Sequence, residues 1–168
     1  VGVDNVLCSN GAAEMIFAVV RAVMPKKSLL LAPTFSEYER ALKSVGSQIC
    51  YYYLKEENDF ELQDDFIDYL DDIDMVFICN PNNPVGKIAD KKKAQHIAEV
   101  CGEREIVCVF DECFMDLADG YSMKEKVPVI KAFTKTYAMA GLRLGYIIAD
   151  TDFVCDVQRQ LPMWNVSA

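Results

Sequence analysis

Lys135 and Arg143 are two basic residues placed eight positions apart in a segment that is otherwise apolar or small. Apolar runs flank this segment at residues 127–133 and 144–149. Charged side chains at such a place are costly unless a partner satisfies them. A lysine amine can form an imine with an aldehyde, and an arginine can bind two phosphate oxygens at once. The pair therefore suggests a site for pyridoxal phosphate.

Three further side chains could complete such a site, and each also has an ordinary structural interpretation. Asp111 follows an apolar run and could keep a pyridine nitrogen protonated, or it could form a turn. Asn83 lies in the turn-rich loop 80–86, and its amide could donate to a phenolate-like oxygen. Phe35 follows a Pro-Thr pair and could stack on a flat ring, or it could pack in the core.

A junction of small residues, Asn10-Gly11-Ala12-Ala13, joins an apolar run to a helical pattern. Small side chains let backbone N–H groups approach an anion there, and the helix dipole favours negative charge. An ordinary helix cap is the alternative. The glycine fingerprint of dinucleotide-binding folds is missing, and no Gly-Lys-Ser/Thr follows as it does in a P-loop.

The elements that must position these residues alternate along the chain. Apolar runs predict strands at residues 5–8, 28–32, 48–54, 75–79, 106–110, 127–133 and 144–149. Apolar residues spaced three and four apart predict helices at 16–23, 38–45, 62–70, 90–102 and 154–161. This alternation predicts an α/β fold, a three-layer α/β/α sandwich with a mostly parallel central sheet. Ligands bind such sheets at the carboxyl ends of the strands, where the candidate residues stand.

Composition bounds the function classes. The 168 residues suit one domain, and the 52% hydrophobic fraction is enough for a core. A net charge of −9 argues against a general nucleic-acid or anionic-membrane surface, and no apolar run approaches the roughly 20 residues of a membrane span. The single histidine, His96, argues against a Ser-His-Asp hydrolase, and no metal site is expected.

The cysteines and the chain ends indicate the setting. Seven cysteines, with no Cys-x-x-Cys pair, predict buried, reduced thiols in a cytoplasmic protein. The chain opens at Val1 almost directly on a core strand and ends just after Trp164-Asn165-Val166-Ser167. We therefore expect a piece of a longer protein.

In order and spacing, the candidate segments resemble the large domain of fold-type I pyridoxal-phosphate enzymes, the aspartate aminotransferase superfamily. The branch that contains histidinol-phosphate aminotransferase and threonine-phosphate decarboxylase is the most similar. The matching segments are Asn10-Gly11-Ala12-Ala13-Glu14, Pro33-Thr34-Phe35, residues 80–86, Asp111-Glu112-Cys113-Phe114, Thr134-Lys135 and Gly141-Leu142-Arg143-Leu144-Gly145. Residues 1–168 would then be the cofactor-binding large domain, without the amino-terminal arm and the small domain.

The resemblance implies a role for each candidate residue. Lys135 would attach the cofactor covalently, and Asp111 would pair with its pyridine nitrogen, so these two are the expected catalytic residues. Asn83 would bind the O3′ oxygen of the cofactor, and Phe35 would stack on its ring. The residues expected around the phosphate are Gly11, Ala12, Ala13, Thr134 and Arg143.

Two positions depart from the pattern of the relatives. Phe114 stands where a tyrosine often reaches the same O3′ oxygen, and Ala132 stands where a serine or threonine commonly contacts the phosphate. Both changes could weaken or retune cofactor binding. Neither removes a group that the chemistry requires.

The reaction is open between two readings. The segments 111–116, 134–135 and 160–167 look like threonine-phosphate decarboxylase, although Met163 separates the proline and tryptophan that are adjacent in that family. A histidinol-phosphate aminotransferase or a related aminotransferase is the alternative, and a non-catalytic core fragment is an alternative of another class. The resemblance implies a small amino-acid or amino-phosphate substrate and a homodimer at full length.

Overall fold

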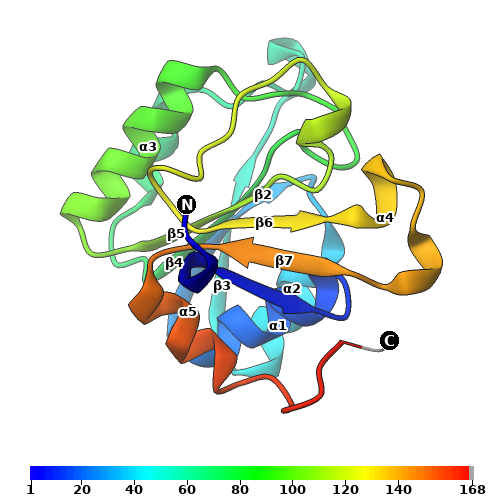
Figure 1. Cartoon of the computed structure of the whole chain (residues 1–168). Helices are drawn as coiled ribbons and strands as arrows, with labels where there is room; N and C mark the ends of the chain where they lie inside the picture. Colours follow the sequence, from blue (N-terminus) through cyan, green and yellow to red (C-terminus); the bar gives the residue numbers. More distant parts are fainter. Residues whose placement is uncertain (167–168) are drawn as a thin grey trace.

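A computed structural model of the chain describes residues 1–166, and within them seven strands form one sheet flanked by helices (Figure 1). The strands are β1 Val6–Ser9, β2 Lys27–Ala32, β3 Gln48–Tyr53, β4 Met75–Cys79, β5 Val107–Asp111, β6 Val129–Ala132 and β7 Gly145–Ile148. The α-helices are α1 Ala12–Val23, α2 Ser36–Ser44, α3 Lys91–Glu103, α4 Phe133–Thr136 and α5 Thr151–Gln158. The 3₁₀ helices are η1 Val3–Asn5, η2 Glu56–Asn58, η3 Asp64–Tyr69, η4 Met115–Leu117 and η5 Ala140–Leu142.

The sheet has the strand order β1-β7-β6-β5-β4-β2-β3. β7 runs antiparallel to both of its neighbours, and all other paired strands are parallel. The predicted, mostly parallel sheet is therefore confirmed. Cys79 at the end of β4 lies opposite Asp111 at the end of β5, so the residues that follow these strands emerge at one edge of the sheet.

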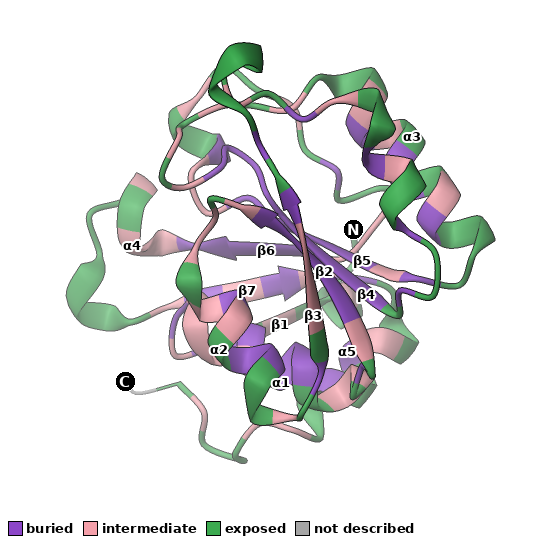
Figure 2. Cartoon of the chain, turned by 180° about the vertical axis from the view of Figure 1, so that it is seen from behind, coloured by how far each residue is buried: buried purple, intermediate pink, exposed green. Residues whose placement is uncertain are grey.

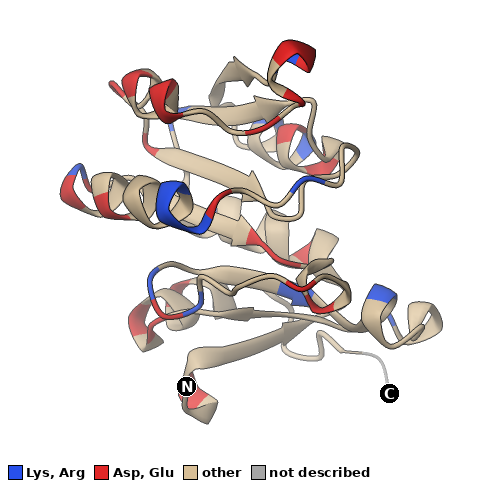
Figure 3. Cartoon of the chain, turned by 90° about the horizontal axis from the view of Figure 1, so that it is seen from above, with Lys and Arg blue, Asp and Glu red and all other residues tan. Residues whose placement is uncertain are grey.

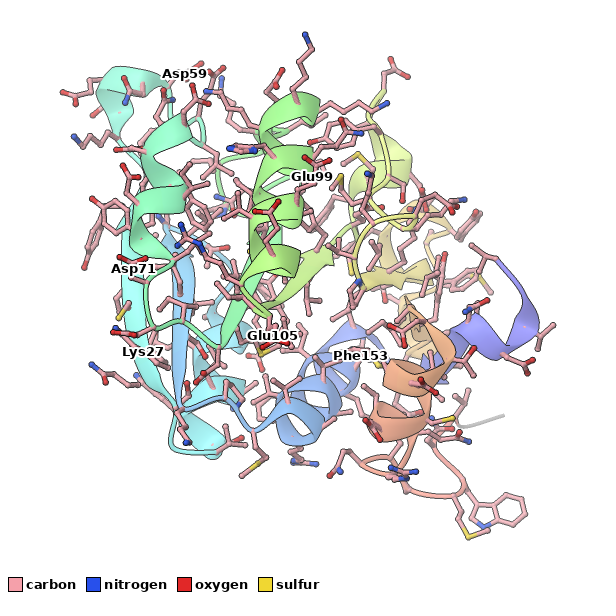
Figure 4. The ribbon with its side chains drawn as sticks, turned by 90° about the vertical axis from the view of Figure 1, so that its left-hand side faces the viewer. Lys27, Asp59, Asp71, Glu99, Glu105 and Phe153 are labelled. Carbon is pink, nitrogen blue, oxygen red and sulfur yellow. The ribbon has the colours of Figure 1, made fainter. Side chains whose placement is uncertain are left out.

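Helices cover both faces of the sheet, which confirms the three-layer sandwich. One apolar core lies beneath α3 and η3, with Phe66, Ile97 and Phe110 among its buried side chains. A second core lies on the opposite face beneath α1, α2 and α5, with Ile16, Leu42 and Val157. Figure 2 shows the buried strands between these layers, and Figure 4 shows Glu99 on α3 and Phe153 on α5. Burial of both faces explains why the strands are apolar on both sides.

Side chains at the helix starts fix where two helices begin. The Asp90 carboxylate accepts hydrogen bonds from the backbone amides of Lys92 and Lys93, at 2.9 and 3.1 Å. Asp90 is therefore the N-cap of α3. At the start of α1, the Glu14 carboxylate accepts a hydrogen bond from the backbone amide of Asn10 at 2.7 Å, and this bond holds the strand–helix junction around Gly11.

The structure corrects three expectations. The segment 62–70 is not an α-helix but carries the 3₁₀ helix η3, because its aspartates compete for backbone hydrogen bonds and favour short turns. The strand expected at 127–133 ends at Ala132, and Phe133 already begins α4.

All seven cysteines are free, but Cys8 and Cys155 are exposed rather than buried. Of the carboxyl-terminal segment 160–167, Ser167 lies outside the described residues.

The surface is acidic on several sides. Figure 3 shows aspartates and glutamates along the outer helices and loops, with fewer lysines and arginines among them. In the part of the chain that the structure describes, no helix has the length and apolar character needed to cross a membrane. His96 is exposed on α3.

Candidate active site

A cavity of about 230 Å³ opens at the carboxyl ends of β4, β5 and β6. Every candidate residue named from the sequence lines this cavity except Gly11, which lies directly beside it. The lining residues are Ala12, Ala13, Phe35, Cys79, Asn83, Asp111, Cys113, Phe114, Ala132, Thr134, Lys135 and Arg143. Segments more than 120 positions apart in the sequence therefore meet at one place.

One end of the cavity is suited to an anion. Gly11 has a φ of +83°, which glycine adopts without strain, and a Cβ there would lie only 2.9 Å from Nη2 of Arg143. The guanidinium thus lies against the start of α1. The first amides of a helix have no acceptor within the helix, so those of Ala12 and Ala13 are available beside the guanidinium. Thr134 lines the same cavity from α4.

Asp111 supplies the carboxylate of the cavity and is only 4% exposed. Its Oδ2 accepts a hydrogen bond from the Tyr38 hydroxyl at 2.7 Å, and its Oδ1 accepts one from the Cys113 amide at 3.0 Å. Burial, and next the negative charge of Asp111, raises the pKa of Cys79 to about 12 and shifts the pKa of Cys113 in the same direction. Both thiols therefore stay neutral, and Asp111 is the anion on this side of the cavity.

Lys135 lies in α4, the single helical turn that follows β6. Its Nζ is 5.6 Å from the centroid of the Phe114 ring, a distance at which a cation is attracted by the ring face. The lysine side chain is exposed and the ring beside it is apolar. Phe114 therefore contacts the amine rather than donating a hydrogen bond.

Asn83 and Phe35 come from two loops that are tied together. The side-chain amide nitrogen Nδ2 of Asn82 donates to the Pro33 backbone carbonyl at 2.9 Å, and the Thr34 hydroxyl donates to the side-chain Oδ1 of Asn82 at 2.9 Å. These bonds hold the loop after β4 against the loop after β2. Asn83 and Phe35 are placed on the same cavity as a result.

Two features of this region were missed in the sequence. The apolar spacing of residues 38–45 predicts a helix, but it does not show that the Tyr38 hydroxyl meets Asp111, 73 positions away. Lys131 was counted within an apolar strand, but it is a buried cation with its Nζ 2.5 Å from Asp116 and 4.0 Å from Glu112. A lysine inside an otherwise apolar run was the signal available for the second feature.

Glu112 predicts a pH dependence of stability. It is 1% exposed, its Oε1 accepts from the Met123 amide at 2.6 Å, and its Oε2 has no hydrogen-bond partner among the described residues. Burial raises the pKa of Glu112 above its usual value, and the Met123 amide and the Lys131 charge oppose that shift. The folded protein therefore holds this proton to a higher pH than the unfolded chain, whose glutamate pKa is about 4.3. The contribution of Glu112 to the free energy of unfolding is therefore lost as pH rises from about 4.3 through the higher pKa of this group in the folded protein.

Replacing Glu112 with glutamine removes this ionisation. We expect Glu112→Gln to raise the melting temperature of the full-length protein relative to wild type at pH 7, with the gain shrinking towards pH 4. The matched control is Glu99→Gln on α3, where the side chain is 57% exposed and pairs with Lys126 at the surface. Thermal melts at both pH values test this, and an equal gain at the two pH values contradicts the assignment.

The sequence matches the family described as aminotransferase class I and II over residues 2–167. The chain belongs to the class I and II aminotransferases. Threonine-phosphate decarboxylase of Salmonella typhimurium is 34% identical over 97% of this chain and 47% of that protein. Histidinol-phosphate aminotransferase of Methanococcus aeolicus is 28% identical over 96% of this chain and 46% of that protein.

A solved structure agrees with these matches. The histidinol-phosphate aminotransferase from Clostridium acetobutylicum has a TM-score of 0.86 at 28% identity, covering 96% of this chain and 50% of that one. Members of the class I and II aminotransferases are pyridoxal-phosphate enzymes. This aminotransferase chain spans about half the length of the curated relatives it matches.

Proposed function

We propose that residues 1–168 form the cofactor-binding large domain of a pyridoxal-phosphate enzyme, and that the cavity at the ends of β4, β5 and β6 holds the cofactor. The observation that carries this proposal is the convergence of Lys135, Asp111 and Arg143 on one cavity. A reactive amine, a buried carboxylate and an anion site at a helix start are the groups that this cofactor requires.

The donor set of the cavity fits the cofactor group by group. The guanidinium of Arg143, the amides of Ala12 and Ala13 and the Thr134 hydroxyl would hold the phosphate. Ala132 contributes no hydroxyl, so the phosphate would have one donor fewer than in relatives that carry serine or threonine there. The remaining donors include one full positive charge and a helix start, and both favour an anion.

The other residues would bind the ring. Asp111 would keep the proton on the pyridine nitrogen, because its buried carboxylate is the negative charge on that side. Asn83 would donate to the O3′ oxygen, and Phe35 would pack against the ring face. When bound, pyridoxal phosphate supplies an electron sink that stabilises negative charge at the substrate Cα.

Lys135 would serve twice in the reaction. Its amine would hold the cofactor covalently, and as a free amine it would take or return a proton at the substrate Cα. The side chains that orient the substrate would decide whether its carboxylate is lost as CO₂ or its amino group is transferred.

For the substrate, we propose a small phosphorylated amino acid and a decarboxylation like that of threonine-phosphate decarboxylase. The 34% identity to the enzyme of that name in Salmonella typhimurium supports this choice. Amino transfer, as in histidinol-phosphate aminotransferase, is the second candidate, supported by the relatives of that name.

We also propose that the full-length protein is a cytoplasmic homodimer. The seven free cysteines suit a reducing compartment. Three large apolar side chains near the cavity are exposed, namely Tyr137 at 58%, Met139 at 36% and Leu142 at 51%. A second copy that covered this turn would remove apolar surface from water.

The substrate is tested directly. Full-length protein, loaded with pyridoxal phosphate, is incubated with O-phosphothreonine and CO₂ release is measured, and with histidinol phosphate plus 2-oxoglutarate and glutamate is measured. We expect CO₂ from the first mixture, and none from a Lys135→Ala variant carried in parallel. Glutamate formation without CO₂ release would rule out the decarboxylase in favour of the aminotransferase.

A further inference from the structure

Tyr38 is the largest polar side chain that is buried directly behind the cavity. It lies on α2, is 0% exposed, and is not among the residues that line the cavity. Its ring stacks on Phe77 of β4, with centroids 4.9 Å apart and planes at 7°. A hydroxyl buried this deeply is costly unless it finds a partner, and this one donates to Oδ2 of Asp111 at 2.7 Å.

The hydrogen bonds of Asp111 fix the orientation of its carboxylate and leave each oxygen able to accept another donor. Oδ2 accepts from the Tyr38 hydroxyl, and Oδ1 accepts from the backbone amide of Cys113. A carboxylate offers about four lone-pair sites, so each oxygen can accept one more donor from the cavity. Two anchors on different oxygens set the plane of the carboxylate, and loss of either one lets it turn.

The ring of Tyr38 also contacts a second candidate residue. Phe35 stands three positions earlier, at the start of α2, and meets the Tyr38 ring edge-on, with centroids 5.6 Å apart and planes at 83°. Phe35 and Asp111 both line the cavity. Tyr38 of α2 therefore connects the aromatic side chain just before α2 with the carboxylate at the end of β5.

The hydroxyl is a permanent donor. Burial, and next the adjacent charge of Asp111, raises the pKa of Tyr38 well above its usual value. The neighbouring thiol of Cys79 acts in the same direction. Tyr38 keeps its proton across the physiological range, and the hydrogen bond to Asp111 persists with it.

We propose that Tyr38 is a positioning residue of the cofactor pocket, which holds Asp111 in the orientation that meets the pyridine nitrogen and holds Phe35 against the ring. This rests on the proposed function, since it takes pyridoxal phosphate as the occupant of the cavity. Tyr38 touches neither cofactor nor substrate. It acts through the two residues that do.

The test is Tyr38→Phe in the full-length protein, which keeps the ring and its stacking on Phe77 and removes only the hydroxyl. We expect the dissociation constant for pyridoxal phosphate to rise about 5- to 10-fold, the effect of one buried hydrogen bond. Hydrogen exchange at the Cys113 amide in the apoprotein is expected to speed up by a similar factor of about 5 to 10, because that amide donates to the same carboxylate.

The matched control is Tyr52→Phe. Tyr52 is 5% exposed, belongs to the core on the opposite face of the sheet, and donates a hydrogen bond to Asp65. Removing the Tyr52 hydroxyl deletes a hydrogen bond of the same kind away from the cavity. We therefore expect the free energy of unfolding to fall, while the affinity for the cofactor and the hydrogen exchange of the Cys113 amide stay at wild-type values. Equal cofactor affinity in Tyr38→Phe and Tyr52→Phe overturns the positioning role.

The two readouts separate this inference from the proposed function. If wild-type protein binds no pyridoxal phosphate, the proposed function and the cofactor role of Tyr38 both fall, whatever the Cys113 amide does. If wild type binds the cofactor but neither affinity nor exchange changes in Tyr38→Phe, the function stands and only the positioning role is wrong. Changes in both measurements support the inference.

Discussion

Replacing Lys135 with alanine is expected to abolish the absorbance near the edge of the visible range that marks lysine-bound pyridoxal phosphate in the full-length protein. Turnover should fall by at least about 10²–10⁴-fold, the usual share of a positioned acid–base group, and further through the lost covalent attachment. Lys135 is exposed, and within residues 1–166 its amine pairs only with the face of Phe114, so the fold does not depend on it. Absorbance spectra and single-turnover rates check the result.

Two variants separate chemistry from charge. Lys135→Arg keeps a cation beside the Phe114 ring but cannot form the covalent bond, so it should lose the absorbance as completely as the alanine variant does. Lys92→Ala on α3 removes an exposed lysine elsewhere and should behave as wild type. An absorbance band that survives in Lys135→Arg would show that another amine carries the cofactor.

The fold could be predicted from the sequence because both faces of the sheet are covered. Strands such as β4, which is buried at every position, read as continuous apolar runs whose neighbours are helices. The order of the strands in the sheet and the antiparallel direction of β7 could not be predicted from this pattern. An apolar run indicates that a strand is buried, but not which strand it pairs with. The prediction of an α-helix at 62–70 was wrong for a related reason. The burial of Leu62, Phe66 and Leu70 does not distinguish an α-helix from 3₁₀ turns.

The cavity lining could largely be predicted because parallel strands end at one edge of the sheet. Asp111 ends β5, and Asn83 and Lys135 follow β4 and β6. These three strands are parallel, so their carboxyl ends bring the three residues together. Their chemical roles stay predictions. The contact that supports Asp111 could not be predicted. The apolar spacing of residues 38–45 places Tyr38 on the buried face of a helix, but only the stacking of its ring on Phe77 of β4 brings its hydroxyl to Asp111.

Gly145 is another residue whose importance comes from packing. It opens β7, is buried, and lies between Ser9 of β1 and Ala132 of β6. A Cβ at this position would lie 2.5 Å from the amide nitrogen of Ala12 and 2.5 Å from the carbonyl carbon of Gly11. Both contacts are with backbone, which cannot rotate away as a side chain can, so either β7 or the start of α1 must move.

Gly145→Ala is therefore expected to cost about 1–3 kcal/mol of unfolding free energy or more, the range for forced overpacking. The displaced groups are the proposed phosphate site itself, because Ala12 supplies an amide to it and Arg143 stands two positions before the glycine. We expect the dissociation constant for pyridoxal phosphate to rise at least about 10-fold, since each tenfold requires only about 1.4 kcal/mol.

The matched control for that variant is Gly141→Ala in the same segment. A Cβ at Gly141 would meet nothing within 4 Å, and the residue is exposed, so its melting temperature and cofactor affinity should stay at wild-type values. Urea unfolding and fluorescence titration with pyridoxal phosphate measure both effects. If Gly145→Ala loses stability but keeps its affinity, β7 has yielded and α1 has stayed, and the anion site does not depend on this contact. Loss of both shows that the close approach of β7 to the start of α1 is what shapes the phosphate end of the cavity.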